Sequence, residues 1–197
     1  MRRILGIDPG SIKTGWGVIE IEESRVSYID SGILQLGDGT MVQRLVVLYE
    51  GLQNVIRQYQ PTEAAIEEVF LAKNFQSALK LGQARGVAML SAGQAAILTR
   101  EFAAKTVKQA VCGQGQAGKS QMQSMVIKLL GLVENPGEDA ADALGIALCA
   151  AYTKDGVLAE AEELLSDAEE MRSESEELMR EAINDQVRIA SLWEQSP

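Results

Sequence analysis

The segment ILGIDPGS, residues 4–11, sets the architecture, because an apolar run typical of a strand ends on an aspartate and a sharp turn. Residues 3–8 are expected to form a buried strand, and the Pro9-Gly10 step marks the turn that follows it. Apolar strands do not usually stop on a bare acid unless a positive charge is held there. Asp8 is therefore a candidate ligand for a metal ion.

Three further carboxylates stand in comparable positions. Glu67 follows the apolar residues 64–66, and Asp139 and Asp142 lie at the start of an alanine-rich helix. Residues three apart share one helix face, so both aspartates can point to one ion. Oxygen ligands without nitrogen or sulfur select Mg²⁺ or Mn²⁺. We predict that Asp8 and these three acids bind metal.

The Glu67-Glu68 pair leaves a choice, because successive strand residues point to opposite faces of a sheet. Ala65 and Glu67 share one face, whereas Ile66 and Glu68 share the other. Only one glutamate can therefore face the metal. We choose Glu67, because continued alternation would otherwise bury Glu68 beside the apolar Ile66 face.

Each acidic motif also has an alternative reading. Asp8 can cap a turn, and Asp139 with Asp142 can be a helix N-cap followed by a surface acid. Actin-like ATPases and sugar kinases also place an aspartate and a Gly-rich turn after their first strand. A chain of 197 residues is too short for their two-lobed architecture.

The composition narrows the chemistry further. The chain contains no histidine, which excludes a Ser-His-Asp triad and a His-rich zinc site. The two cysteines, Cys112 and Cys149, make no disulfide framework or zinc site and have no histidine to activate them. Metal-activated water remains the route to a strong nucleophile at neutral pH. Two hard cations held by shared carboxylates can bind both the attacking and the leaving oxygen of a phosphodiester, which points to phosphoryl chemistry.

The net charge of −10 is distributed unevenly. Residues 155–197 contain 13 acidic and 3 basic side chains, whereas residues 1–154 are neutral overall. Within the neutral part, residues 73–128 contain 8 basic side chains and one acid, Glu101. A basic middle segment between acidic segments suits a polyanion that lies across a metal site. The alternative is that these basic side chains only solvate helix faces.

The order of the predicted elements favours an α/β fold with a mixed sheet flanked by helices. The first three strands are joined by short turns and should pair antiparallel, whereas the later strands need helical crossovers and should be parallel. Strands are expected at residues 3–8, 15–22, 26–35, 64–70 and 96–102; helices are expected at 41–59, 75–92, 119–131 and 138–152, with 103–112 as helix or loop.

The composition divides the chain into a domain, residues 1–154, and an acidic extension, residues 155–197. Small or apolar residues recur in the extension at alternating spacings of four and three, which is typical of a coiled-coil helix. A disordered acidic tail is the alternative, because the extension is rich in glutamate. The chain has no apolar run of about 18 residues and no secretory signal pattern, so we expect a cytoplasmic protein.

An aromatic and basic segment follows the Glu67 strand. Phe70 and Phe75 lie close to Lys73 and Asn74, and aromatic rings among lysines can stack on unpaired bases. Core packing at the edge of a loop is the alternative for these rings.

Two lysines flank the Gly-rich turn at residues 113–118. Lys108 precedes this turn and Lys119 opens a helix, where backbone N–H groups also favour phosphate. Either lysine can neutralise a phosphate and stabilise developing negative charge. A solvated lysine without such a role is the alternative.

Taken together, these segments resemble the RuvC family of Holliday-junction resolvases, in order and at family spacing over about residues 1–152. The matching stretches are LGIDPGS (5–11), AIEEVF (65–70), AKN (72–74), SALKLGQARG (77–86), VKQ (107–109), KSQ (119–121) and DAADAL (139–144).

The resemblance implies an RNase H-like fold with a five-stranded sheet, a homodimer, and Mg²⁺-dependent nicking of two opposed strands at a four-way DNA junction. It implies two Mg²⁺ ions per subunit, for which Mn²⁺ can substitute, and the RuvA and RuvB branch-migration proteins as partners. The family's metal-binding acids fall on Asp8, Glu67, Asp139 and Asp142, its junction-contacting aromatic on Phe70, and its catalytic lysines on Lys108 and Lys119. The full set of DNA-contacting candidates is Phe70, Lys73, Asn74, Phe75, Lys80, Arg85, Lys105, Lys108 and Lys119.

The chain departs from the family at three places. Some relatives carry histidine near the last acidic pair, where this chain has Asp139, so an all-carboxylate site is expected. Residues 113–119 are less basic than a DNA-contacting loop usually is, and the acidic extension lies outside the resemblance. The predicted function is a junction-resolving endonuclease. A nuclease of the same fold acting on structured RNA and a non-catalytic junction-binding scaffold are the alternatives.

Deletion of residues 155–197 should tighten DNA binding at low salt, because it removes the whole net negative charge of −10. The gain should be several-fold and should shrink as salt screens the charges. Fluorescence anisotropy with a labelled junction over a salt series measures it. An affinity that the deletion leaves unchanged throughout the series would dismiss this screening.

Overall fold

The structure is a computed structural model that describes residues 2–23, 25–68 and 75–153. The chain divides into two units, Met1–Thr153 and Lys154–Pro197, and all described residues lie in the first. The predicted boundary near residue 154 stays a prediction, and the choice between helix and disorder for residues 155–197 lies outside the described residues. No helix in the described part is both long and apolar enough to cross a membrane.

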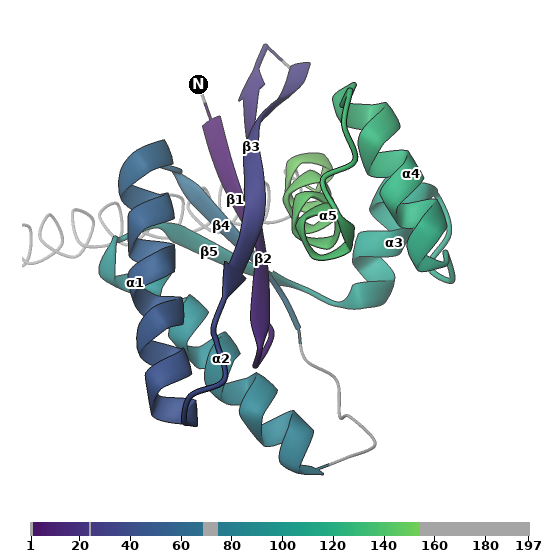
Figure 1. The fold of residues 1–197 in the computed structure, drawn as a ribbon. Coiled ribbons are helices and arrows are strands. Elements are labelled where there is room, and N and C mark those ends of the chain that lie inside the picture. Colours follow the sequence, from purple (N-terminus) through teal and green to yellow (C-terminus); the bar gives the residue numbers. More distant parts are fainter. Residues whose placement is uncertain (1, 24, 69–74, 154–197) are drawn as a thin grey trace, which may run out of the picture. The chain divides into compact units, whose positions relative to one another are not determined.

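One mixed sheet of five strands forms the centre of this unit, as predicted (Figure 1). The first three strands pair antiparallel, whereas the fourth pairs parallel with the first and the fifth parallel with the fourth. The strand order is therefore β3-β2-β1-β4-β5. The strands are β1 (Arg2–Asp8), β2 (Lys13–Glu22), β3 (Arg25–Gln35), β4 (Glu63–Glu67) and β5 (Leu98–Phe102).

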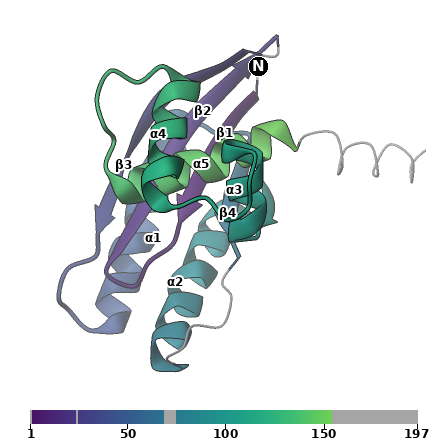
Figure 2. The same ribbon diagram turned by 90° about the vertical axis from the view of Figure 1, so that its right-hand side faces the viewer.

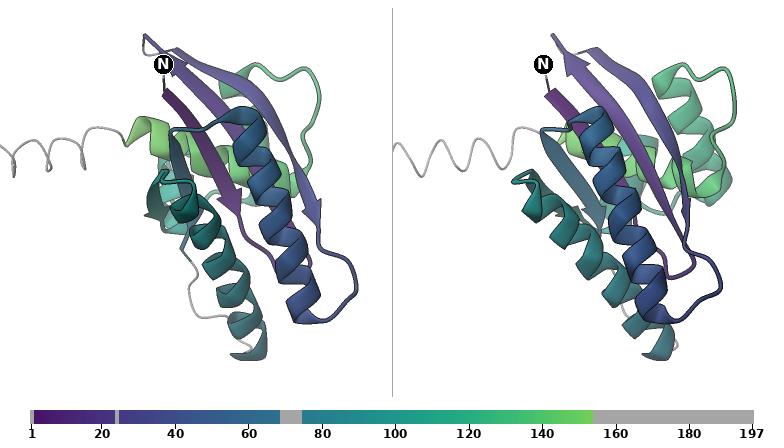
Figure 3. Two further views of the ribbon diagram at one scale, coloured as in Figure 1. Left: turned by 90° about the vertical axis from the view of Figure 1, so that its left-hand side faces the viewer. Right: turned by 60° about the vertical axis from the view of Figure 1, so that its left-hand side comes forward.

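Helices cover both faces of the sheet. Figure 1 shows α1 and α2 on one side of the strands and α3, α4 and α5 on the other. Figure 2 presents the side with α3, α4 and α5, and Figure 3 the side with α1 and α2. The segment that was expected as helix or loop is helical. The helices are α1 (Met41–Tyr59), α2 (Phe75–Gln94), α3 (Ala104–Cys112), α4 (Lys119–Leu130) and α5 (Glu138–Tyr152).

Local chemistry accounts for where the elements begin and end. α1 starts with a capping box in which Thr40 and Gln43 satisfy each other's free backbone groups, and it ends at Gln60 immediately before Pro61. β5 begins two residues later than expected. The chain turns first at Ala96, which has a left-handed φ of 53°, and Ile97 still donates to the carbonyl of Ala92.

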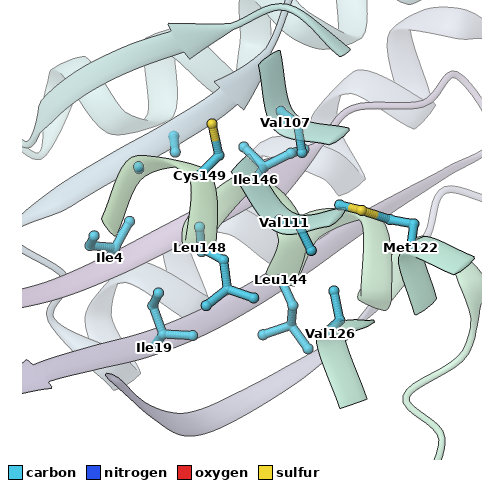
Figure 4. Close-up of a cluster of buried hydrophobic side chains, with 13 residues drawn as sticks. Ile4, Ile19, Val107, Val111, Met122, Val126, Leu144, Ile146, Leu148 and Cys149 are labelled. Atoms are coloured by element: carbon cyan, nitrogen blue, oxygen red, sulfur yellow. The ribbon is translucent and has the colours of Figure 1, made fainter. Parts of the chain in front are cut away.

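Strand alternation divides the core into two layers. Leu5 and Ile7 of β1 point to the α1–α2 side, where they pack with Leu48 and Leu52 of α1. The intervening Ile4 points to the opposite side and joins a cluster formed mainly by α3, α4 and α5 (Figure 4). The labelled members of this second cluster are Ile4, Ile19, Val107, Val111, Met122, Val126, Leu144, Ile146, Leu148 and Cys149.

α5 crosses the sheet at very short range, because glycine and alanine line the contact. A Cβ atom on Gly6 of β1 would lie only 2.0 Å from the carbonyl oxygen of Ala143, and one on Gly15 of β2 would lie 2.0 Å from that of Asp139. Side chains larger than hydrogen at these two strand positions would force the helix outward. The first turn of α5 is thus held directly over the end of β1.

The other end of α5 is held by buried charges. Arg2 and Arg100 both donate to a carboxylate oxygen of Glu63, at 2.6 and 2.9 Å, and both donate to the carbonyl of Ala150 near the end of α5. Burial alone would raise the pKa of Glu63, but the two guanidinium groups hold it below its ordinary value. Cations suit the carbonyl end of a helix, so this cluster fixes the second end of α5.

We expect Gly6→Ala to lower the free energy of unfolding by about 2–4 kcal/mol, because the added methyl would overlap the Ala143 carbonyl. Gly82→Ala is the matched control. Gly82 lies inside α2 with nothing within 4 Å of an added Cβ, so its replacement should raise stability by up to about 1 kcal/mol. Urea denaturation of both variants measures the difference. Equal effects of the two substitutions would contradict the close packing of α5.

Candidate functional site

Two of the predicted acids are brought together by the parallel pairing of β1 and β4. Ile7 of β1 lies opposite Ile66 of β4, so Asp8 and Glu67 follow side by side at the same edge of the sheet. Both point to the face covered by α5, because Gly6 and Asp8 alternate with the buried Ile7. The choice of Glu67 over Glu68 agrees with this arrangement.

A cavity of about 280 Å³ opens at this edge and combines acidic, basic and apolar side chains. Asp8 and Glu67 line the cavity from the ends of β1 and β4, and Asp142 lines it from the first turns of α5. Lys108 of α3 and Lys119 of α4 line the same cavity, since both helices pack beside α5 (Figure 2). The remaining lining residues are Ala104, Val107, Met122 and Ile146.

The other acids of α5 point to two exposed lysines. Asp139 accepts a hydrogen bond from Nζ of Lys13, the first residue of β2. Glu138 accepts one from Nζ of Lys119, at the start of α4. Asp139 is not among the residues that line the cavity. Five of the six predicted catalytic residues therefore meet at one cavity, and the sixth lies beside it in an ion pair.

The acids of the cavity resist ionisation. Burial, reinforced by the charges of Glu67 and Asp142, raises the pKa of Asp8 to about 7. Burial, followed by the charge of Asp142, likewise raises the pKa of Glu67, although Lys108 and Lys119 act in the opposite direction. Three carboxylates and two lysines line the cavity, so its acids outnumber its bases.

This excess of negative charge fits a divalent cation. The available donors are carboxylate oxygens alone, which is the set that Mg²⁺ and Mn²⁺ prefer. Within residues 2–23, 25–68 and 75–153, no group of three or more His, Cys, Asp or Glu side chains is already arranged to hold a metal ion. Asp139 would have to leave Lys13 to join the set. The residues therefore fit the ion in charge and donor chemistry.

Two of the predicted DNA-contacting residues, Lys108 and Lys119, line the cavity, and the other seven fall into three groups. Phe75 and Lys80 of α2 and Lys105 of α3 are exposed, and Phe75 retains 74% of its accessible surface. Arg85 of α2 is held in an ion pair with Glu101 of β5 at 2.5 Å. Phe70, Lys73 and Asn74 lie outside the described residues. Core packing is excluded for Phe75 within this unit, whereas DNA contact by any of these residues stays a prediction.

Sequence reasoning missed the two ion-pair partners next to the site. Glu138 and Lys13 belong to none of the motifs that predict site residues. The contact of Lys13 with Asp139 joins residues 126 positions apart in the sequence, so no local pattern indicates it. A weak signal exists, because the hairpin that follows Asp8 must return Lys13 to the same edge of the sheet.

A mixed sheet in this order, with acids gathered from β1, β4 and α5, defines a nuclease of the RNase H-like fold. The chain belongs to the RuvC family: the family model described as crossover junction endodeoxyribonuclease RuvC matches residues 4–150. The chain is 50% identical over 161 residues to the RuvC endodeoxyribonuclease of Marinobacter nauticus, which covers 82% of this chain and 92% of that protein. It is 48% identical over 159 residues to that of Psychromonas ingrahamii, covering 81% and 92%.

Solved structures show the same fold. Thermus thermophilus RuvC in complex with a Holliday junction substrate superimposes with a TM-score of 0.72 at 29% identity, covering 77% of this chain and 94% of that one. The yeast mitochondrial Holliday junction resolvase Ydc2 superimposes with a TM-score of 0.58 at 16% identity, covering 77% and 78%. At that identity, the yeast structure supports the fold alone.

Asp8→Asn should stabilise the protein in the presence of a chelator. The raised pKa means that the folded state keeps its proton on Asp8 up to about pH 7, whereas the unfolded state loses it near pH 4. Stability therefore falls as the pH rises from about 4 to about 7, and the variant should escape this loss, gaining roughly 4 kcal/mol at pH 8 and almost nothing at pH 4.

Urea denaturation at both pH values measures the gain, with Asp38→Asn, on an exposed loop, as the control. A difference between Asp8→Asn and the natural protein that does not depend on pH would contradict the raised pKa.

Proposed function

We propose that this chain is a Holliday-junction resolvase, an endonuclease that nicks two opposed strands of a four-way DNA junction in a metal-dependent reaction. The observation that carries the proposal is the cavity where Asp8, Glu67 and Asp142 meet Lys108 and Lys119. Membership of the RuvC family supports it, as does the superposition on a RuvC structure with a Holliday junction substrate at 29% identity.

In this proposal, Asp8, Glu67, Asp139 and Asp142 hold two Mg²⁺ ions per subunit, and Mn²⁺ can take their place. When bound, the ions supply an activated water and steady the leaving oxygen of the phosphodiester. The carboxylates fix the position of the ions on two rigid strands and one helix. Burial and the neighbouring acids raise the pKa of Asp8 to about 7, and a cation bound beside it would lower that pKa.

The lysines of the cavity act on the phosphate. Lys108 of α3 and Lys119 of α4 line the cavity, and their charges offset part of the rise in the pKa of Glu67. A phosphodiester that enters the cavity gains negative charge as it is attacked, and two ammonium groups stabilise that charge. Lys119 must leave its ion pair with Glu138 to do so; both side chains are more than half exposed, so this pair is weak.

A homodimer would place two such cavities on one junction, which matches paired cuts in opposed strands. Exposed apolar side chains on the α1–α2 side support an association between copies, among them Val42 and Val46 of α1 and Leu79 and Leu90 of α2. Branch-migration proteins of the RuvA and RuvB type are proposed as partners from the family alone. We propose a cytoplasmic location.

Asp8→Asn should abolish cleavage of a four-way junction and leave junction binding within about twofold of normal. The variant loses a metal ligand but keeps the basic surface that carries most of the affinity for DNA. Gel-based cleavage and anisotropy with the same labelled junction measure the two activities. Asp38→Asn, which removes an equal charge from an exposed loop, should retain both.

Equal loss of binding and cleavage in Asp8→Asn would count against the metal role of this residue. A parallel panel of four-way DNA junctions and structured RNA tests the substrate. Cleavage of the RNA alone would replace the resolvase by an RNA nuclease of the same fold, and binding without any cleavage would favour a scaffold.

A further inference from the structure

The Lys13 side chain starts from a rigid piece of backbone next to the cavity. Gly10 N–H donates to Oγ1 of the buried Thr14 at 3.2 Å, and the same hydroxyl donates to the Gly10 carbonyl at 3.3 Å. A Cβ on Gly10 would lie 2.1 Å from the carbonyl oxygen of Lys13, so the turn is tightly closed. This tight turn places the Lys13 side chain at the first turn of α5, where it binds Asp139.

Asp139 lies near the other acids but is paired with Lys13. It lies three residues before Asp142 on α5, so the two side chains share a helix face. Its charge acts on both Asp8 and Asp142, which line the cavity. Asp139 itself does not line the cavity and instead accepts a hydrogen bond from Lys13.

Only side chains can change this arrangement. Gly15 of β2 packs directly against the backbone carbonyl of Asp139, where even a methyl group would overlap. The helix start therefore cannot slide toward the cavity or away from it without breaking the contact. Any movement of the Asp139 carboxylate toward the cavity therefore requires rotation of its own side chain and release of Lys13.

We propose that Lys13 is a positioning residue that holds the Asp139 carboxylate outside the metal-binding set until a divalent cation displaces it. The proposal rests on the proposed metal-binding role of Asp139. Lys13 thus acts as an internal counter-ion and sets a threshold cation concentration for completing the site.

The chemistry of the pair suits such a release. The Lys13 side chain is 49% exposed and that of Asp139 is 21% exposed, and ion pairs open to water are weak. A lysine is a single charge on a flexible stem, whereas a divalent cation brings two charges and is also attracted by Asp8 and Glu67. The cation therefore displaces Lys13 from Asp139 once its concentration is sufficient, and Lys13 raises the cation concentration that this displacement requires.

Isothermal titration calorimetry with Mg²⁺ alone, on the full-length protein without DNA, tests the proposal. Lys13→Gln should bind Mg²⁺ about threefold to tenfold more tightly than the natural protein. Lys13→Arg keeps the ion pair and should restore an affinity close to the natural one. Lys128→Gln removes an equal charge from the exposed surface of α4 and should leave the affinity unchanged.

A double-mutant cycle separates release of Asp139 from a general effect of charge. In an Asp139→Asn background, Lys13→Gln should change Mg²⁺ affinity by less than about twofold, because no carboxylate remains to be released. An equal gain in both backgrounds would overturn the proposal, since Lys13 would then act only through its field. Unchanged affinity in Lys13→Gln would also overturn it. Absence of Mg²⁺ binding in every protein, the natural one included, would refute the metal site itself.

Discussion

The close approach of α5 to the first two strands is the constraint on which the site depends. Gly6 and Gly15 present no side chain to the helix, so the carbonyls of Ala143 and Asp139 lie almost on the sheet. Parallel pairing independently puts Asp8 beside the end of β4. A helix held one side chain further out would separate the aspartates of its first turns from the strand ends and leave Asp8 and Glu67 without Asp142.

The two ends of α5 show opposite ways of treating buried charge. At the carbonyl end, Arg2 and Arg100 satisfy Glu63 and the Ala150 carbonyl, so the charges are compensated within the fold. At the amino end, acids converge with only partial compensation, and the pKa of Asp8 rises to about 7. Uncompensated charge in a rigid fold is destabilising and is typical of a site that awaits a ligand. This contrast identifies which end of the helix is functional.

The sequence predicts the strand and helix order and the pairing directions well, because each apolar run and each turn acts locally. Strand alternation indicates that only one of Glu67 and Glu68 can face the cavity, whereas the choice of Glu67 rests mainly on the family resemblance. No such rule predicts which side chain Asp139 binds. Its partner Lys13 is 126 residues away in the sequence. Their contact depends on how closely α5 approaches Gly15, and that distance is set by tertiary packing. Family resemblance names the acids but not the lysine that holds one of them.

The most direct test of the account is cleavage of a synthetic four-way junction labelled on each strand in turn, with Mg²⁺ or with EDTA. The account predicts nicks at symmetric positions in two opposed strands, only with Mg²⁺. These nicks should leave 5′-phosphate and 3′-hydroxyl ends that a ligase can seal. Tight binding without cleavage, over several junction sequences and with Mn²⁺ as well as Mg²⁺, would contradict the claim that these acids form a nuclease site.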